Sequence, residues 1–131
     1  KVGGYREDFF VDLVDVEYCL RVRQYGYTVA LTTDAYMVHA AGAPEAHQFL
    51  GRTVWTMNHS PRRAYDLCRN HAVLLRSYGA VERAWATAAS WSLLKWAVKA
   101  LLFERSRAAM LAAISKGLTG GWFTGAPAER P

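Results

Sequence analysis

Apolar residues recur at helical spacing near the start of the chain. In residues 15–25 the apolar positions Val16, Cys19, Leu20 and Val22 share one helical face, and Gly26 follows as a stop signal. The pattern predicts a helix over residues 15–25.

Three more helices are predicted in the second half. Ser60 and Pro61 form a strong helix start, because a serine side chain caps free amides and proline fits the first turn. Gly79 and Gly117 follow apolar-periodic stretches and are read as helix ends. The predicted helices are 61–78, 81–104 and 106–116.

Strand-like patterns are short. Residues 27–31 and 36–38 are rich in β-formers and predict two short strands, whereas 40–60 contains glycine and proline with little periodicity and predicts a loop. The predicted fold class is α+β and mostly helical. A helix with two short strands occupies residues 1–42, a loop 43–60, and a helical bundle 61–131.

Residues 84–103 have the length of a membrane span, about 20 residues. Lys95 and Lys99 lie well inside this stretch, and each costs about 2.5–3.5 kcal/mol at the bilayer centre, so a span is not expected. A helix this apolar still needs a cover. The alternatives are the neighbouring helices, a second copy of the chain, or the surface of an anionic bilayer.

The chain has 131 residues, of which 52% are apolar and 21% are charged. This length and composition are typical of one globular domain. The chain begins at Lys1 rather than methionine, so we expect it to be a piece of a longer protein. The net charge of +5 is uneven: up to Asp34 there are four basic and six acidic residues, and from Ala35 onward twelve and five. This asymmetry indicates an acidic working site followed by an anion-facing or membrane-facing surface.

The two cysteines, Cys19 and Cys68, have no metal-finger or Cys-x-x-Cys spacing. Both lie in predicted helices, where a free cysteine usually acts as a small core residue. A reducing compartment is therefore expected.

The most informative segment is residues 4–21, which alternates carboxylates with apolar residues. Asp15 lies at the start of the predicted helix, where the helix dipole favours an anion. On spacing alone, a helix cap or a solvated charge is the more common explanation for any one of these acids. The five carboxylates are Glu7, Asp8, Asp12, Asp15 and Glu17.

Several motifs in residues 3–78 resemble a known family. They are a Phe-Phe-x-Asp-x-x-Asp-x-Glu run at 9–17, Cys-Leu-Arg at 19–21, Gly-Tyr at 26–27, a downstream His39, and the arginine-rich stretch 62–70. This pattern resembles the second half of family 2 inverting glycosyltransferases with the GT-A fold. It is most similar to bacterial rhamnosyltransferases.

The resemblance implies roles for two residues. Asp15 falls where the family places the general base that takes the proton from the acceptor hydroxyl. His39 falls where many members have a histidine that helps hold a divalent cation, Mg²⁺ or Mn²⁺, on the sugar-nucleotide diphosphate. Val14 departs from the pattern, because many members have an acid before the base. Asp12 either supplies that second charge or is itself the base.

Arginines Arg62, Arg63 and Arg69 lie on the helix predicted after residue 60. Guanidinium groups bind phosphate oxygens through forked hydrogen bonds, so these three are candidate ligands of a donor or lipid-linked diphosphate. A solvated basic face is the alternative. Glu17 and Arg21 are expected to pair within the first helix.

The resemblance implies transfer of a sugar, such as rhamnose or another deoxyhexose, from a nucleotide diphosphate to a polysaccharide or lipid-linked acceptor with inversion. The family binds the nucleotide in its first half through an Asp-x-Asp motif, which this sequence lacks. We therefore expect the isolated chain to be inactive and to hold no cofactor.

The expected location is the cytoplasm, with peripheral contact to the inner face of the plasma membrane as an open alternative. Unpaired strand edges favour a homo-oligomer. Nucleic-acid binding is not expected, because basic and aromatic residues do not interleave on a strand-like surface. A helical dimerisation or membrane-docking module without catalytic role is the competing function.

Overall fold

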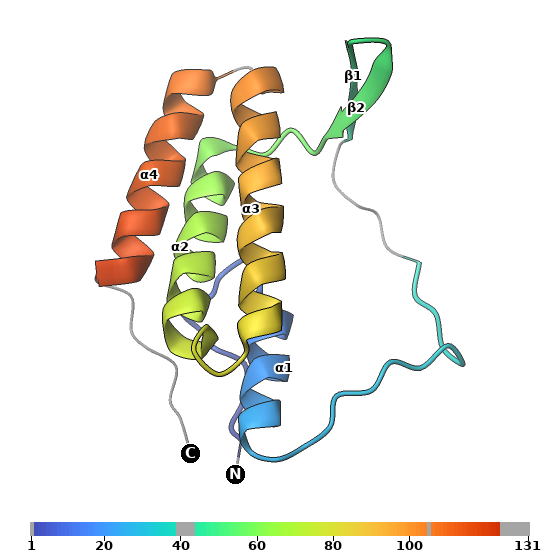
Figure 1. Cartoon of the computed structure of the whole chain (residues 1–131), viewed down its shortest axis with the longest axis vertical. Helices are drawn as coiled ribbons and strands as arrows, with labels where there is room; N and C mark the ends of the chain where they lie inside the picture. The colour runs from blue at the N-terminus through green and yellow to red at the C-terminus, as the bar shows by residue number, and fades with distance from the viewer. Residues whose placement is uncertain (1, 39–43, 105, 124–131) are drawn as a thin grey trace.

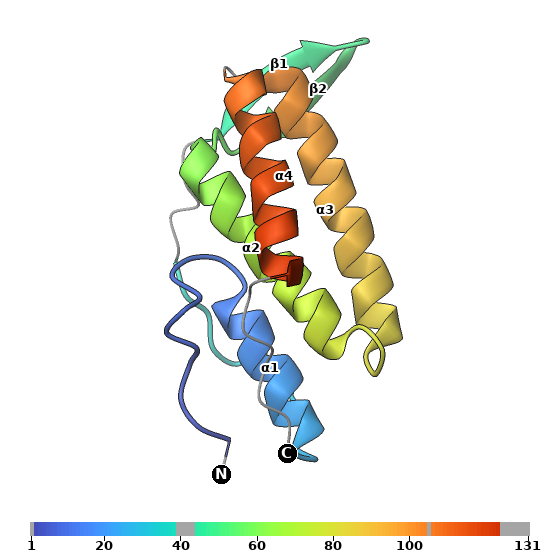
Figure 2. The same ribbon diagram turned by 90° about the vertical axis from the view of Figure 1, so that its left-hand side faces the viewer.

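The computed structural model of the chain describes residues 2–38, 44–104 and 106–123. Three long helices lie side by side, with the shorter α1 against one end of α2 and a β-hairpin projecting at the other end (Figures 1 and 2). The predicted class, mostly helical α+β with two strands, is confirmed. The elements are α1 Val14–Gln24, β1 Glu45–Phe49, β2 Arg52–Thr56, α2 Pro61–Tyr78, α3 Arg83–Phe103 and α4 Arg107–Phe123.

The positions of the predicted strands were wrong. Residues 27–31 and 36–38 form no strand, and their apolar side chains are exposed, Leu31 to 96%. The strands instead lie inside the predicted loop, as an antiparallel hairpin in which Ala46 faces Trp55. Leu50 and Gly51 both have positive φ, which suits a two-residue hairpin turn. The hairpin forms because this turn brings the second strand alongside the first, whereas residues 27–38 find no partner strand among the residues that the structure describes.

The predictions for α2 and α3 are close to the structure. Ser60 Oγ accepts a hydrogen bond from the backbone N–H of Arg63, Pro61 occupies the first turn, and Gly79 follows the helix. Helix α3 begins and ends within two residues of its prediction. Among the described residues, no helix combines the length with the apolarity that a membrane crossing requires.

Helix α4 runs seven residues beyond the predicted end at Lys116. Gly117 and Gly121 are buried against α2, and a side chain at either position would collide with the backbone carbonyl of Tyr65 or of Arg69. These glycines let two helix backbones approach closely. Packing against α2 therefore offsets the cost that glycine imposes on a helix.

The core consists of two clusters joined along α2. One packs α1 and the preceding loop against the second half of α2 and includes Phe9, Leu20, Leu74 and Tyr78. The other packs the first half of α2 against α3 and α4, around Ala64, Ala100, Met110 and Ala113. Helix α2 thus packs against both the acidic N-terminal segment and the layer formed by α3 and α4.

Three side chains of α2 hold the loop that precedes α1. The buried Asn70 amide donates to the carbonyls of Val11 and Asp12, at 2.9 and 3.1 Å. Arg63 makes a forked ion pair with Asp12, at 2.8 and 2.9 Å. Arg69 bonds the carbonyl and carboxylate of Asp8. We call Arg63, Arg69 and Asn70 the α2 clamp.

The α2 clamp holds a strained backbone. Asp12 and Leu13 have φ values of 60° and 66°, a region that non-glycine residues rarely adopt. Such conformations persist where surrounding bonds impose them. Because Leu13 is the cap residue of α1, the clamp sets where that helix begins and where its first side chains point.

Replacing Gly117 with alanine is expected to destabilise the chain by about 1–3 kcal/mol, because the new methyl group overpacks the contact between α4 and α2. The matched control is Gly120→Ala on the same helix. Its added carbon meets only the Tyr65 hydroxyl at 3.5 Å, so it should be neutral or stabilising by up to about 1 kcal/mol. Urea unfolding measures both changes, and equal effects would refute the close-packing account.

Asn70→Ala is expected to lower the free energy of unfolding by about 1–3 kcal/mol, because the carbonyls of Val11 and Asp12 lose the donor that the buried Asn70 amide supplies. Arg62→Gln is the surface control. The Arg62 side chain is 84% exposed, and its single bond to Asp66 should contribute less than about 0.5 kcal/mol. Similar unfolding midpoints for the two variants would count against the clamp.

Candidate functional site

Asp15 lies in the first turn of α1 and is exposed to solvent. Two consecutive positive-φ residues, Asp12 and Leu13, turn the chain immediately before α1, and the N-terminal end of that helix favours the negative charge of Asp15. Within the described residues, its carboxylate takes part in none of the side-chain hydrogen bonds or ion pairs. Asp15 is therefore an accessible acceptor on a fixed backbone.

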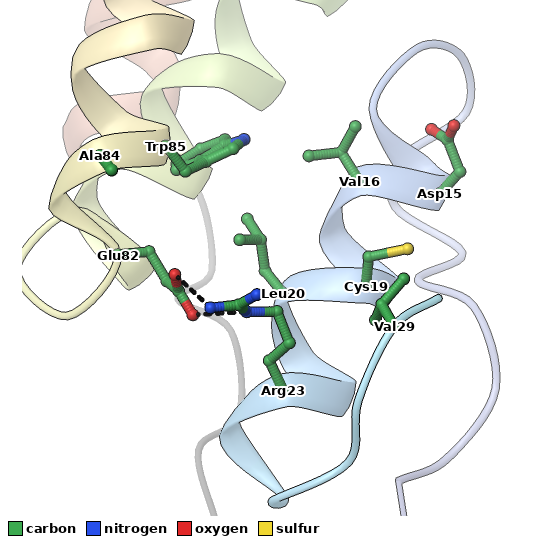
Figure 3. Close-up of a pocket in the computed structure, with 9 residues that line it drawn as sticks. All are labelled: Asp15, Val16, Cys19, Leu20, Arg23, Val29, Glu82, Ala84 and Trp85. Carbon is green, nitrogen blue, oxygen red and sulfur yellow. Dashed lines mark hydrogen bonds and ion pairs between the residues drawn. The ribbon is translucent and has the colours of Figure 1, made fainter. Parts of the chain in front are cut away.

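A cavity of about 520 Å³ opens beside Asp15, between α1 and the beginning of α3. Figure 3 shows Asp15 at one end, the ion pair of Arg23 with Glu82 (3.0 Å) at the other, and the Trp85 indole across from Val16. The cavity is mostly apolar with charged groups at its ends, a composition common in ligand sites. Its other lining residues are Cys19, Leu20, Val29 and Ala84.

Glu17 has the opposite environment to Asp15, two residues away. Its carboxylate is fully buried, accepts from the Tyr78 hydroxyl at 2.9 Å and pairs with Arg21 at 3.1 Å. Burial is the main reason that the pKa of Tyr78 is raised, and the hydrogen bond to Glu17 adds to the effect. The Tyr78 hydroxyl therefore keeps its proton and donates a hydrogen bond to Glu17. Arg21 also donates to the carbonyls of Val2 and Gly4. The predicted pairing of Glu17 with Arg21 is confirmed.

Asp8 and Asp12 are held by arginines. The hydrogen bond from Arg6 is the main reason that the pKa of Asp8 lies below its usual value, and Arg69 adds to this effect. Both oxygens of Asp12 accept from Arg63. Each of these carboxylates is engaged in holding the loop, which leaves Asp15 the most available of the acids that flank the turn.

The three candidate diphosphate ligands lie on α2 in different surroundings. Arg63 and Arg69 use their guanidinium groups on Asp12 and Asp8, with side chains 42% and 22% exposed. Arg62 is 84% exposed and reaches only Asp66, at 3.3 Å. Their role toward a diphosphate stays a prediction, with Arg62 the most accessible.

His39, the predicted cation ligand, lies outside the described residues. Across residues 2–38, 44–104 and 106–123, no three His, Cys, Asp or Glu side chains lie close enough together to hold a metal ion. A cation held by three protein side chains is therefore not formed within these residues alone.

Two other histidines, His59 and His71, lie in surroundings that lower the pKa of the ring. Burial and the nearby Arg63 lower the pKa of His59, whose ring lies 6.0 Å from that of Trp96. Burial likewise lowers the pKa of His71, despite its hydrogen bond to the Leu67 carbonyl. Both are therefore expected to be neutral at pH 7.

The cysteines are both free. Cys68 is buried, and burial raises the pKa of its thiol to about 12, which makes it unreactive. Cys19 is partly exposed and lines the cavity. The prediction of Cys68 as a core residue is confirmed.

Sequence reasoning missed four residues that shape the site. Asn70 and Tyr78 bond the acidic segment from α2, and Glu82 and Trp85 close the cavity from the start of α3. All four lie more than fifty residues from the groups they contact, so local spacing carries no sign of them.

The chain is 41% identical over 75 residues to the dTDP-rhamnosyl transferase RfbF of Shigella flexneri. The match covers 57% of this chain and 24% of that protein, so the matched part is about a quarter of its length. No family model matches the chain, and neither does any solved structure. The similarity supports a relationship to rhamnosyltransferase-like glycosyltransferases.

Proposed function

We propose that this chain is the C-terminal part of a family 2 inverting glycosyltransferase of the GT-A fold. The intact enzyme moves a deoxyhexose, such as rhamnose, from a nucleotide diphosphate to a polysaccharide or lipid-linked acceptor. The similarity to a dTDP-rhamnosyl transferase supports the class. The observation that carries the mechanism is the exposed Asp15 carboxylate at the start of α1, beside a cavity.

In this proposal Asp15 is the general base. As the acceptor oxygen attacks the anomeric carbon, its proton passes to the Asp15 carboxylate, and the bond from that carbon to the diphosphate oxygen breaks on the opposite face. A base must lie within hydrogen-bond reach of the proton it takes, which requires an accessible carboxylate. Asp15 meets this condition in the described structure.

Asp12 is the weaker candidate for the base. Its two oxygens accept a forked pair of hydrogen bonds from Arg63, at 2.9 and 2.8 Å, so both are already engaged in an ion pair. We assign Asp12 to holding the loop. The negative charge that it brings near the turn is balanced locally by Arg63.

The donor and its cation are assigned to the part of the enzyme outside the described residues, together with His39. The divalent cation would neutralise the leaving diphosphate when bound. On α2, Arg62 is the candidate for contact with diphosphate oxygens, because its guanidinium is largely exposed. Arg63 and Arg69 position the acidic loop.

We expect Asp15→Asn, made in the intact enzyme that contains this chain, to lower kcat by about 10²–10⁴, because the amide cannot accept the acceptor proton. Donor binding should be unchanged, since Asp15 acts on the acceptor. Transfer from dTDP-rhamnose, measured with donor affinity, tests both points. The matched control is Glu7→Gln in the same segment, with an exposed carboxylate that the mechanism does not use.

Asp12→Asn should act differently, lowering thermal stability more than Asp15→Asn and kcat less. Full activity in Asp15→Asn, or loss of turnover in Asp12→Asn without loss of stability, would contradict the base assignment. The isolated 131-residue chain should show no transfer from dTDP-rhamnose. Turnover by that chain alone would refute the proposal that donor binding requires another part of the enzyme.

A further inference from the structure

Helix α3 is apolar over most of its surface but packs on one side only. Ala100 is buried, and Trp96 and Leu101 pack against the cluster formed with α2 and α4. The opposite side presents Trp91 and Leu94, exposed to 59% and 52%. A helix with this composition is normally covered on every side by protein or lipid.

The uncovered residues form one continuous face. Positions 91, 94, 95, 98, 99 and 102 follow an i, i+3, i+4, i+7, i+8, i+11 pattern, so they lie in one stripe over about three turns of the helix. A shallow groove of about 720 Å³ follows this stripe. We call Trp91, Leu94, Lys95, Val98, Lys99 and Leu102 the α3 face.

The charge of the α3 face has one sign. Lys95 and Lys99 are both exposed, and α3 contains no acidic residue between Arg83 and Phe103. The nearest acid beyond its end, Glu104, is buried and accepts from the backbone N–H of His59. The Lys95 ammonium lies 5.9 Å from the centre of the Trp91 ring, so the cation borders the apolar surface.

The positive charge of the α3 face distinguishes between two possible binding partners, a second copy of the chain and an anionic bilayer. In a symmetric pair of α3 faces, Lys95 and Lys99 of one copy would meet the same lysines of the other, and α3 supplies no acid to offset the repulsion. An anionic bilayer surface complements the face instead. Tryptophan and leucine enter the headgroup boundary, while lysine stems lie along it and place their ammonium groups at lipid phosphates.

We propose that α3 docks on an anionic lipid surface through the α3 face, lying parallel to the bilayer rather than crossing it. Apolar burial of Trp91, Leu94, Val98 and Leu102 supplies one part of the binding, and Lys95 and Lys99 supply the other. Neither part rests on the proposed catalytic function. The α3 face and Asp15 are separate features of the molecule.

The test is flotation of the 131-residue chain with vesicles of equal parts phosphatidylglycerol and phosphatidylcholine, and with phosphatidylcholine alone. Binding to the anionic vesicles is expected, with much weaker binding to the neutral ones. Lys95→Gln and Lys99→Gln should each lower the partition coefficient about five-fold, as loss of one lysine near an anionic surface does. Leu94→Ser should lower it by a similar factor, and this loss should persist at high salt.

Lys116→Gln is the matched control, because it removes one exposed lysine from α4 and leaves the α3 face intact. It should change the partition coefficient less than two-fold. Circular dichroism confirms that each variant keeps its helices.

Three results would overturn the proposal. They are absence of flotation with the anionic vesicles, equal binding to the neutral ones, and an equal loss in Lys116→Gln. Light scattering in the absence of lipid adds a fourth outcome. A dimer that Leu94→Lys converts to a monomer would assign the α3 face to a second copy instead.

Discussion

The α2 clamp, which holds the loop before α1, is the constraint on which the rest of the structure depends. Asn70 and Arg63 bind the backbone and carboxylate of a turn in which Asp12 and Leu13 adopt positive φ values. Without these bonds the turn would relax toward ordinary backbone conformations, since each strained residue costs about 1–3 kcal/mol. The start of α1, and with it the placement of Asp15, follows from contacts made more than fifty residues away along the chain.

Neighbouring carboxylates acquire different roles through their environments. Glu17 is buried and bonded to Tyr78 of α2 and to Arg21, and Arg21 in turn donates to the carbonyls of Val2 and Gly4. These contacts join α1 to α2 and to the first residues of the chain. Asp15, two residues earlier, faces solvent. Pairs of acids whose surroundings differ in this way commonly divide structural and chemical work between them. The acidic segment thus combines a buried anchor with an exposed group suited to proton transfer.

Local signals predicted the helices, and non-local contacts explain what was missed. Ser60, Pro61 and Gly79 mark both ends of α2 in the sequence, because caps act within one turn. Gly117 misled the prediction for α4, since its helical conformation depends on a close approach to α2. The pairing of Arg63 with Asp12 and the contribution of Trp85 to the cavity also depend on the fold. Asp15 itself was singled out by its helix position and by the family resemblance.

The central claim is that Asp15 meets the acceptor hydroxyl. The most direct measurement is a structure of the intact enzyme with a nucleotide and an acceptor bound. The account predicts the attacking hydroxyl about 2.6–3.2 Å from an Asp15 carboxylate oxygen, with Asp12 still paired to Arg63. An acceptor hydroxyl bonded to Asp12, or held beyond hydrogen-bond reach of Asp15, would contradict it.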